Sequence, residues 1–162
     1  MPSRVGAPAV RPVRGRATLA VMADDAPTPP VLRATSVTIG VPDVRAAAAF
    51  WSRLLGHRVT ADEPPGPHDP PGAGWAQVAP PPGVPGLTIN LEHEARYRAP
   101  VWPARAGEQV ATQHLDLHVP DGDLDAAVAW ALACGARLAD HQPQDDVRVL
   151  LAPDGHPFCL FV

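Results

Sequence analysis

Apolar and polar residues alternate with a period of two in TSVTIGVPD (35–43) and in QHLDLHVPD (113–121). Because successive side chains of a strand point to opposite faces, each stretch is predicted to be a strand with one buried face. An alanine-rich segment follows each strand, with apolar residues every three or four positions, which predicts a helix with one apolar face. The helices should end at Gly56 and Gly135, since glycine readily takes the left-handed conformation of a helix end.

These stretches belong to a longer internal repeat. The segment VTIGVPDVRAAAAFWSRLLGHRV (37–59) matches LDLHVPDGDLDAAVAWALACGARL (115–138), and Trp51 and Trp130 stand at the same place in each, 79 residues apart. Self-similarity at a fixed offset indicates a duplicated structural unit. The residues expected to cap the helix N-termini are Asp43 and Asp121, the last residues of the two Val-Pro-Asp sequences.

Shorter strand patterns follow each predicted helix. In the first half they are 58–61, 75–79 and 87–91, and in the second half 137–139, 147–152 and 158–162. We therefore predict an α+β fold of two tandem βαβββ modules that form a curved mixed sheet with a central cleft and helices outside. The domain should span 31–162, with modules at about 31–95 and 112–162 and a connection at 96–111.

Composition and charge restrict the possible functions. The chain has 162 residues, 46% of them hydrophobic, which is enough for one domain with its own core. The net charge of −4, with no arginine cluster inside the folded part, argues against nucleic-acid binding. No apolar run approaches the roughly 18 residues of a membrane span, so no membrane partner is expected.

The first thirty residues differ in composition from the rest, and we expect a disordered N-terminal extension there. Its arginine-rich, acid-poor start could be an organelle transit peptide, but a simpler interpretation makes Met22 the true start. Two cysteines, Cys134 and Cys159, lie outside any CxxC pattern, so neither a structural zinc site nor a disulfide framework is indicated. We expect free thiols and a cytoplasmic protein, with Cys134 in the core.

Together with YRAPVWP (97–103) and the ending APDGHPFCLFV (152–162), the repeat resembles the vicinal oxygen chelate superfamily, which includes glyoxalase I, extradiol dioxygenases and bleomycin-resistance proteins. The resemblance covers about residues 32–162, and these last two segments are most similar to the glyoxalase-like branch of bacterial proteins. It implies the βαβββ fold, a cleft that binds a small molecule, and a homodimer.

The resemblance also implies where a metal would be held. Metal-using members place ligands near the start of each first strand and on each last strand. The matching positions here are Ser36, His114, Asn90 (less securely Thr88) and Cys159, where relatives commonly hold a glutamate. This set has one strong ligand, one soft thiol and weak groups, so no cofactor is favoured. If a divalent metal is bound, we expect it on His114, Glu92 and Cys159.

The second alternating strand carries the main candidate chemistry. Leu115, Leu117 and Val119 should face the helices, which leaves His114, Asp116 and His118 toward the cleft. A carboxylate beside an imidazole orients the ring and favours its charged form, so His114 and Asp116 are candidate catalytic residues. The alternatives are a structural or metal-binding His114 and an Asp116 that pairs with an arginine. His118 is expected near the solvated rim.

Other residues are predicted to line the cleft. Ser36 and Thr38 are small and polar and occupy the equivalent face of the first strand. Trp75, Tyr97 and Trp102 could stack on a flat ligand, although packing within the connection or at a dimer contact explains Tyr97 and Trp102 equally well. The full set of candidate substrate-binding residues is Ser36, Thr38, Asn90, Trp75, Tyr97, Trp102, His118 and Cys159.

Three functions remain open from the sequence. The protein could bind a small organic molecule without a catalytic metal, in the manner of drug-sequestering resistance proteins. It could be a lyase, isomerase or dioxygenase similar to relatives of glyoxalase I, using His114 with Glu92 or Cys159. It could also be a non-catalytic interaction protein that keeps only the fold.

Overall fold

The computed structural model describes residues 30–162, within which Ala34–Val162 form one compact unit. The predictions made for residues 1–29, including disorder and a start at Met22, lie outside the described residues. No helix in this described part is long and apolar enough to cross a membrane.

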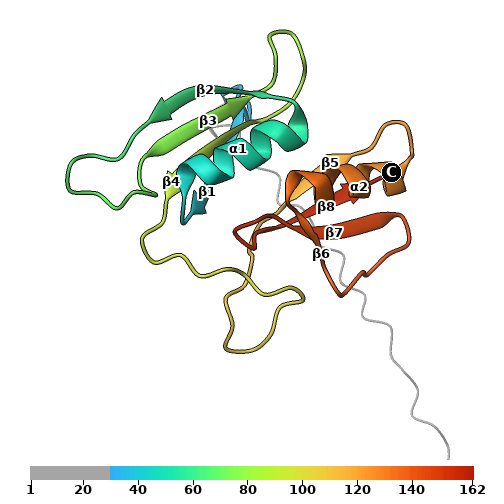
Figure 1. The fold of residues 1–162 in the computed structure, drawn as a ribbon. Helices are drawn as coiled ribbons and strands as arrows, with labels where there is room; N and C mark the ends of the chain where they lie inside the picture. The colour runs from blue at the N-terminus through green and yellow to red at the C-terminus, as the bar shows by residue number, and fades with distance from the viewer. Residues whose placement is uncertain (1–29) are drawn as a thin grey trace, which may run out of the picture. The chain divides into compact units, whose positions relative to one another are not determined.

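The order of elements repeats once along the chain (Figure 1). The first module contains β1 (Ser36–Val41), α1 (Val44–Leu55), β2 (Arg58–Glu63), β3 (Trp75–Ala79) and β4 (Thr88–His93). The second contains β5 (Leu115–His118), α2 (Leu124–Cys134), β6 (Arg137–Leu138), β7 (Val147–Leu151) and β8 (Pro157–Phe161). Both modules are therefore βαβββ units, which confirms the predicted α+β fold class.

Each module forms a mixed sheet of its own. The strand orders are β1-β4-β3-β2 and β5-β8-β7-β6, and in both sheets the first strand pairs in parallel with the last. The described strands therefore make two sheets of four within the chain, where we had expected one curved sheet. The reason is that β1 and β5 each have their ladder partner inside their own module, β4 and β8, and do not pair with one another.

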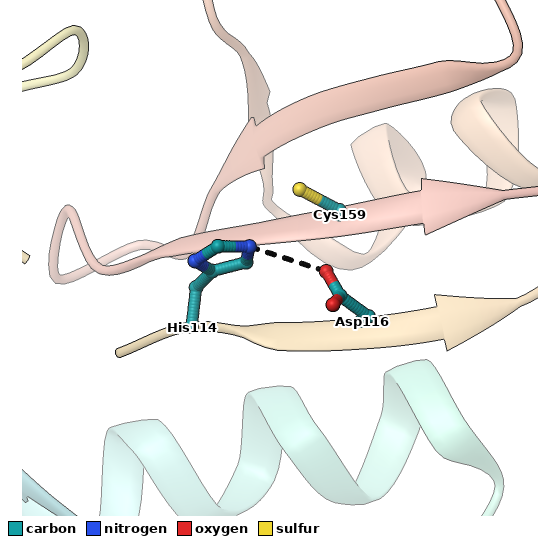
Figure 2. A group of neighbouring side chains, drawn as sticks. All are labelled: His114, Asp116 and Cys159. Carbon is teal, nitrogen blue, oxygen red and sulfur yellow. Dashed lines mark ion pairs between the residues drawn. The ribbon is translucent and has the colours of Figure 1, made fainter. Parts of the chain in front are cut away.

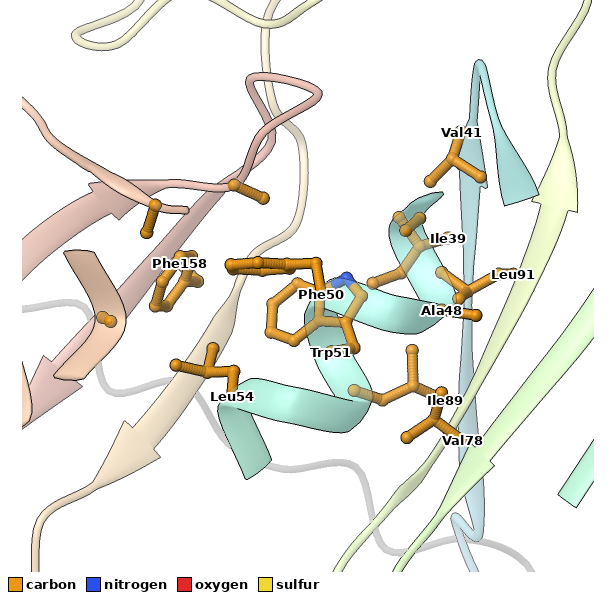
Figure 3. Close-up of a cluster of buried hydrophobic side chains, with 14 of the residues drawn as sticks. Ile39, Val41, Ala48, Phe50, Trp51, Leu54, Val78, Ile89, Leu91 and Phe158 are labelled. Carbon is orange, nitrogen blue, oxygen red and sulfur yellow. The ribbon is translucent and has the colours of Figure 1, made fainter. Parts of the chain in front are cut away.

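Helix α1 packs against both modules. Phe50 and Trp51 of α1 contact Phe158 of β8, with the Trp51 and Phe158 ring centroids 5.5 Å apart. Figure 3 shows Phe158 on one side of α1 and Ile39 and Leu91 of the first sheet on the other. Helix α1 is thus covered on both sides, because its apolar surface extends around to Phe50 and so needs two partners.

The helix ends follow the local sequence signals, with one correction. The Asp43 carboxylate accepts hydrogen bonds from the backbone amides of Arg45 and Ala46, and Gly56 and Gly135 end the helices in the left-handed conformation, as predicted. The second helix is capped by Asp123, whose carboxylate accepts from Ala126, and the prediction of Asp121 is wrong. Pro120 and Asp121 lie in a turn, closed by a hydrogen bond from the Gly122 amide to the Val119 carbonyl oxygen at 3.1 Å, and the cap follows at Asp123.

Candidate functional site

Three side chains with metal-binding or acid–base chemistry meet on the second sheet (Figure 2). Strands β5 and β8 pair in parallel with Asp116 opposite Cys159, and His114 immediately precedes β5. The His114 Nε2 and Asp116 Oδ1 atoms are 3.2 Å apart, and the donor atoms of all three residues lie within 4.8 Å of one another. We call His114, Asp116 and Cys159 the donor trio.

Strand periodicity explains why the trio faces outward. Leu115, Leu117 and Val119 pack against the main hydrophobic core, which leaves His114 and Asp116 on the opposite face, as predicted. Phe158 and Leu160 lie in the same core, while Cys159 packs with Ala139 and Val149 in a smaller cluster on the other face. Figure 2 shows the three side chains on the side of β5 and β8 away from the pale helix below them.

The electrostatics around Cys159 favour the neutral thiol. Burial raises the pKa of Cys159 to about 11, with further contributions from the Asp116 charge and from the thiol–carboxylate hydrogen bond. A thiol needs a lowered pKa to act as a nucleophile at neutral pH. Cys159 is therefore not prepared for nucleophilic catalysis. Asp116 contacts His114 and Cys159, and no arginine of residues 30–162 pairs with it.

The trio lies at a small pocket of the second module, which we call the C-terminal pocket. Its volume is about 360 Å³. Its lining includes the trio and Trp102, Val147, Val149 and Phe161. The Trp102 ring lies 6.5 Å from the His114 ring, and its Nε1 donates to the His141 carbonyl oxygen at 3.2 Å. This bond and the contacts of Trp102 with the Val149 cluster place an aromatic wall beside the trio.

A second, larger cavity of about 790 Å³ lies between the two modules, and we call it the inter-module cavity. It is lined by Val37–Gly40 of the first strand, by the connection, by Gln113–Leu115 and by His156. Tyr97, in the connection, donates a hydrogen bond to the Asp154 carbonyl oxygen at 3.1 Å, and burial raises the pKa of its hydroxyl. His114 lines both cavities, so it marks the point where they approach each other.

The predicted site residues are thus divided between two cavities and positions outside both. Thr38 and Tyr97 line the inter-module cavity, while Trp102 and Cys159 line the C-terminal pocket. The candidates that line neither of these two cavities are Ser36, Asn90, Trp75 and His118.

Their contacts explain why these remaining candidates lie outside the two cavities. The Asn90 Oδ1 accepts a hydrogen bond from Gln77 Nε2 at 3.1 Å, so this amide is engaged within the first sheet. His118 is exposed at the end of β5, 5.2 Å from the Phe161 ring, which agrees with a rim position. Glu92 lies on β4 of the first sheet and is not part of the donor trio. The third residue of the trio is Asp116, because it lies opposite Cys159 in the β5–β8 ladder.

Several lining residues were missed from the sequence. Arg96 and Arg98 of the connection line the inter-module cavity, and so does His156, which precedes β8. Burial lowers the pKa of His156, against the opposing charge of Asp154. The segment APDGHP indicates only a turn, but parallel pairing of the first and last strands places the residue before β8 beside the residues before β5. This pairing leaves no local signal in the sequence, which is why His156 was missed.

A model of the glyoxalase-like domain family matches residues 36–161, nearly the whole described part. The chain belongs to the glyoxalase-like domain family. This confirms the resemblance to the vicinal oxygen chelate superfamily. A search of curated protein sequences found no match to this chain.

Solved structures of the same fold support the assignment. A point mutant of the fosfomycin resistance protein FosX from Listeria monocytogenes, complexed with Mn(II) and 1S,2S-dihydroxypropylphosphonic acid, has a TM-score of 0.60 at 13% identity over 81% of this chain and 92% of that one. A glyoxalase family protein from Enterococcus faecalis has a TM-score of 0.57 at 17% identity, covering 80% and 97%. FosX from Mesorhizobium loti has a TM-score of 0.57 at 11% identity, covering 81% and 91%. At these identities the likeness shows the fold alone.

The donors of this chain do not fit a manganese centre. Mn²⁺ is suited to carboxylate, carbonyl and water oxygens, whereas thiolate selects softer ions. At the positions matching metal ligands of the superfamily, Ser36 is an exposed hydroxyl and Asn90 is bonded to Gln77. Cys159 supplies sulfur where relatives commonly hold a glutamate. These positions are therefore not suited to hold a manganese ion.

Proposed function

We propose that this protein binds a small organic molecule in the inter-module cavity, between modules at about 31–95 and 112–162, without the catalytic metal centre of metal-using relatives. The observation that carries this proposal is the cavity of about 790 Å³, lined by both modules and by the connection. Ligand pockets of proteins typically have volumes of roughly 300 to 1,000 Å³ and combine apolar walls with a few polar groups.

The lining supports an amphiphilic, negatively charged ligand. Val37, Ile39 and Leu87 supply apolar surface from the first module. The exposed Arg96 and Arg98 supply two positive charges, against the single negative charge of the exposed Glu94. A planar guanidinium pairs well with a carboxylate or another oxyanion. An aromatic or aliphatic acid is therefore the ligand class that this surface favours.

A fluorescent aromatic sulfonate, 8-anilinonaphthalene-1-sulfonate, is a suitable probe of the cavity. The wild-type protein should bind it saturably, and Thr38→Trp should weaken the binding at least about tenfold by filling the cavity from β1. The matched control is Thr60→Trp, since Thr60 is an exposed threonine on β2 of the same sheet and lines neither cavity. Equal binding by both variants would contradict the proposal.

A panel of small aromatic and aliphatic acids tests the same proposal without a dye. We expect at least one of them to raise the melting temperature of the wild-type protein and to lose this effect in Thr38→Trp. Stabilisation of the folded state by a ligand follows from mass action and grows with ligand concentration. The absence of any stabilisation would favour the non-catalytic interaction protein.

The His114–Asp116 contact favours a second candidate function, a lyase, isomerase or dioxygenase of the glyoxalase I type. An imidazole held 3.2 Å from a carboxylate has the geometry of a general base and its orienting group. The test is a screen of glyoxalase, ring-opening and ring-cleavage substrates with and without added divalent metal. Activity that disappears in His114→Ala and falls in Asp116→Asn would support this function; no turnover of any substrate would argue against it.

We also propose a homodimer in the cytoplasm. Membership of the glyoxalase-like family, whose superfamily members often dimerise, supports the dimer. Both cysteines lie in the described part as free thiols, which suits a reducing compartment. Sedimentation equilibrium at micromolar concentration tests the dimer, and a monomer mass across the concentration range would contradict it.

A further inference from the structure

We propose that His114, Asp116 and Cys159 form a binding site for one thiophilic divalent cation, of which Zn²⁺ is the best match. This site uses the second module alone and does not use the manganese-type ligand positions of the first. It does not require the proposed binding of an organic molecule, since it rests on the donor trio, of which only His114 also lines the inter-module cavity.

The geometry of the trio suits tetrahedral coordination. With typical zinc–nitrogen, zinc–oxygen and zinc–sulfur bonds, tetrahedral ligand atoms lie about 3.3 to 3.6 Å apart. The His114 Nε2 and Asp116 Oδ1 atoms are 3.2 Å apart, and all three donor atoms lie within 4.8 Å. The side chains of His114 and Asp116 are 38% and 61% exposed, so they can rotate toward an ion held at the buried Cys159 sulfur.

The donor types select the class of ion. One imidazole nitrogen, one carboxylate oxygen and one thiolate sulfur form a mixed set that Zn²⁺ accepts and that Mg²⁺ and Ca²⁺ do not. His114 stands at a ligand position of the superfamily pattern. Asp116 lies two residues further along the strand, at a position that is not a ligand in that pattern. Its place opposite Cys159 in the β5–β8 ladder brings it into the set.

Binding requires one proton transfer and no redox change. The Cys159 S–H bond breaks, the proton passes to water, and the sulfur electron pair forms the bond to the cation. His114 binds through a neutral imidazole nitrogen and Asp116 through an already ionised oxygen. One proton is therefore released per ion at a pH where Cys159 is a thiol, and the apparent affinity should increase with pH.

The surroundings leave room for a further ligand. The C-terminal pocket continues from the trio toward Trp102 and Val149, so a fourth coordination position would face this pocket of about 360 Å³. Three protein ligands and one open position characterise zinc sites that bind an exchangeable molecule. The pocket could thus admit a water molecule or an anion beside the Trp102 ring.

Cobalt substitution gives a direct spectroscopic test on the full-length, untagged protein. Titration of the apo-protein with Co²⁺ should saturate at one ion per chain and produce a sulfur-to-cobalt charge-transfer band, which added Zn²⁺ should remove. Cys159→Ser should abolish the band, and Cys134→Ser, which changes the other cysteine, should leave it intact. A band that survives Cys159→Ser, or one that is lost in Cys134→Ser, overturns the proposal.

The other two ligands need their own variants. Asp116→Asn and His114→Ala should each weaken Zn²⁺ binding at least tenfold in isothermal titration calorimetry, while Glu92→Gln should leave it unchanged, since Glu92 lies on the other sheet. Weakening by Glu92→Gln equal to that by Asp116→Asn overturns the assignment of Asp116. Circular dichroism checks that the variants are folded, which is expected because His114 and Asp116 are exposed.

One further measurement separates this proposal from the proposed function. Titration with 8-anilinonaphthalene-1-sulfonate is repeated in the presence of a chelator. Retained dye binding together with the absence of 1:1 cobalt binding would overturn the metal site alone. Cobalt binding with no dye binding would overturn the inter-module ligand and leave the metal site supported.

Discussion

The two modules share one backbone pattern and differ in what they present on the sheet face away from the core. In the first module Thr38 pairs with Asn90, and in the second Asp116 pairs with Cys159, at equivalent places in the ladders. Asn90 is bonded to Gln77, whereas the residue equivalent to Gln77 next to Cys159 is Val149. On the first face Asn90 is therefore engaged with another amide, whereas on the second face the side chains that contact one another are an imidazole, a carboxylate and a thiol.

The two modules also differ in how their helices are used. Trp51 and Trp130 occupy the same repeat position, yet Trp51 is 1% exposed and Trp130 is 50% exposed. Trp51 contacts Phe158 of the other module, while Trp130 lies along the surface and donates a hydrogen bond to the Leu54 carbonyl oxygen at 3.0 Å. A duplicated sequence position thus has a core role in one module and a peripheral one in the other. The following experiments test this asymmetry.

The largest difference is expected between the two tryptophans. Trp51→Ala should lower the free energy of unfolding by about 3 to 5 kcal/mol, because it removes a large buried side chain from the core that joins the modules. Trp130→Ala should lower the free energy of unfolding by about 1 kcal/mol, since it removes one partly exposed hydrogen bond and some packing. Urea denaturation of both variants measures the difference. Similar losses for the two would show that the core is shared equally by the helices.

The loops that follow each second strand are held by different side chains. Arg45 of α1 donates through Nη2 to the carbonyl oxygens of Pro71 and Ala73 and so fastens the loop before β3. Arg45→Met should lower the free energy of unfolding by about 2 kcal/mol, because it removes charged hydrogen bonds to partly buried carbonyl oxygens. Limited proteolysis should then detect faster cleavage between residues 64 and 74.

Gln142 has the equivalent function in the second module. Its side chain donates to the Ala139 and Val149 carbonyl oxygens and accepts from the Val149 amide at 2.8 Å. Gln142→Leu should lower stability by about 1 to 2 kcal/mol and should expose the segment 139–146 to protease. Increased cleavage of both loops in either single variant would show that the loops are coupled and not held module by module.

Much of this fold could be predicted from sequence because the signals are local. Strand alternation, helical spacing, the Asp43 cap and the Gly56 and Gly135 ends depend on residues within a few positions of one another. The internal repeat added a second, independent copy of the same pattern. The Asp121 cap failed because the inserted Gly122 displaced the helix start, which the repeat alignment alone did not resolve.

The site was predicted less well because it depends on pairing between distant segments. The facing of His114, Asp116 and Cys159 followed from alternation, but the contact between Asp116 and Cys159 requires the register of β5 on β8. The docking of α1 against Phe158 likewise joins residues more than a hundred positions apart. Neither the register nor the docking leaves a local signal in the sequence.

The helix caps should show a smaller asymmetry of the same kind. Asp43→Ala should cost about 1 kcal/mol, because it leaves two backbone amides of α1 without a partner. Asp123→Ala should cost slightly less, about 0.5 to 1 kcal/mol, since Asp123 accepts from one amide. The control is Asp121→Ala, which should be nearly neutral. A loss at Asp121 equal to that at Asp123 would mean that α2 begins earlier in solution than described.

The smallest expected effect concerns the residue that precedes each last strand, Leu87 in the first module and His156 in the second. Both line the inter-module cavity, but only His156 can titrate. Burial lowers the pKa of His156 below its ordinary value of 6.5, despite the neighbouring Asp154. Below pH 6.5 the unfolded chain therefore binds a proton more readily than the folded protein. The contribution of neutral His156 to stability is fully present above pH 6.5 and is lost as the pH falls toward the lowered pKa.

His156→Gln should remove this dependence. The unfolding free energy of the wild type, measured in the presence of a chelator, should decrease from pH 7 to pH 5 more steeply than that of the variant, by a slope of less than one proton. Leu87→Gln is the matched substitution in the first module, and it should shift stability by the same amount at every pH. If the unfolding free energy of the variant changed with pH in parallel with that of the wild type, His156 would titrate in the folded protein as it does in the unfolded chain. In that case the position before the last strand would not distinguish the two modules electrostatically.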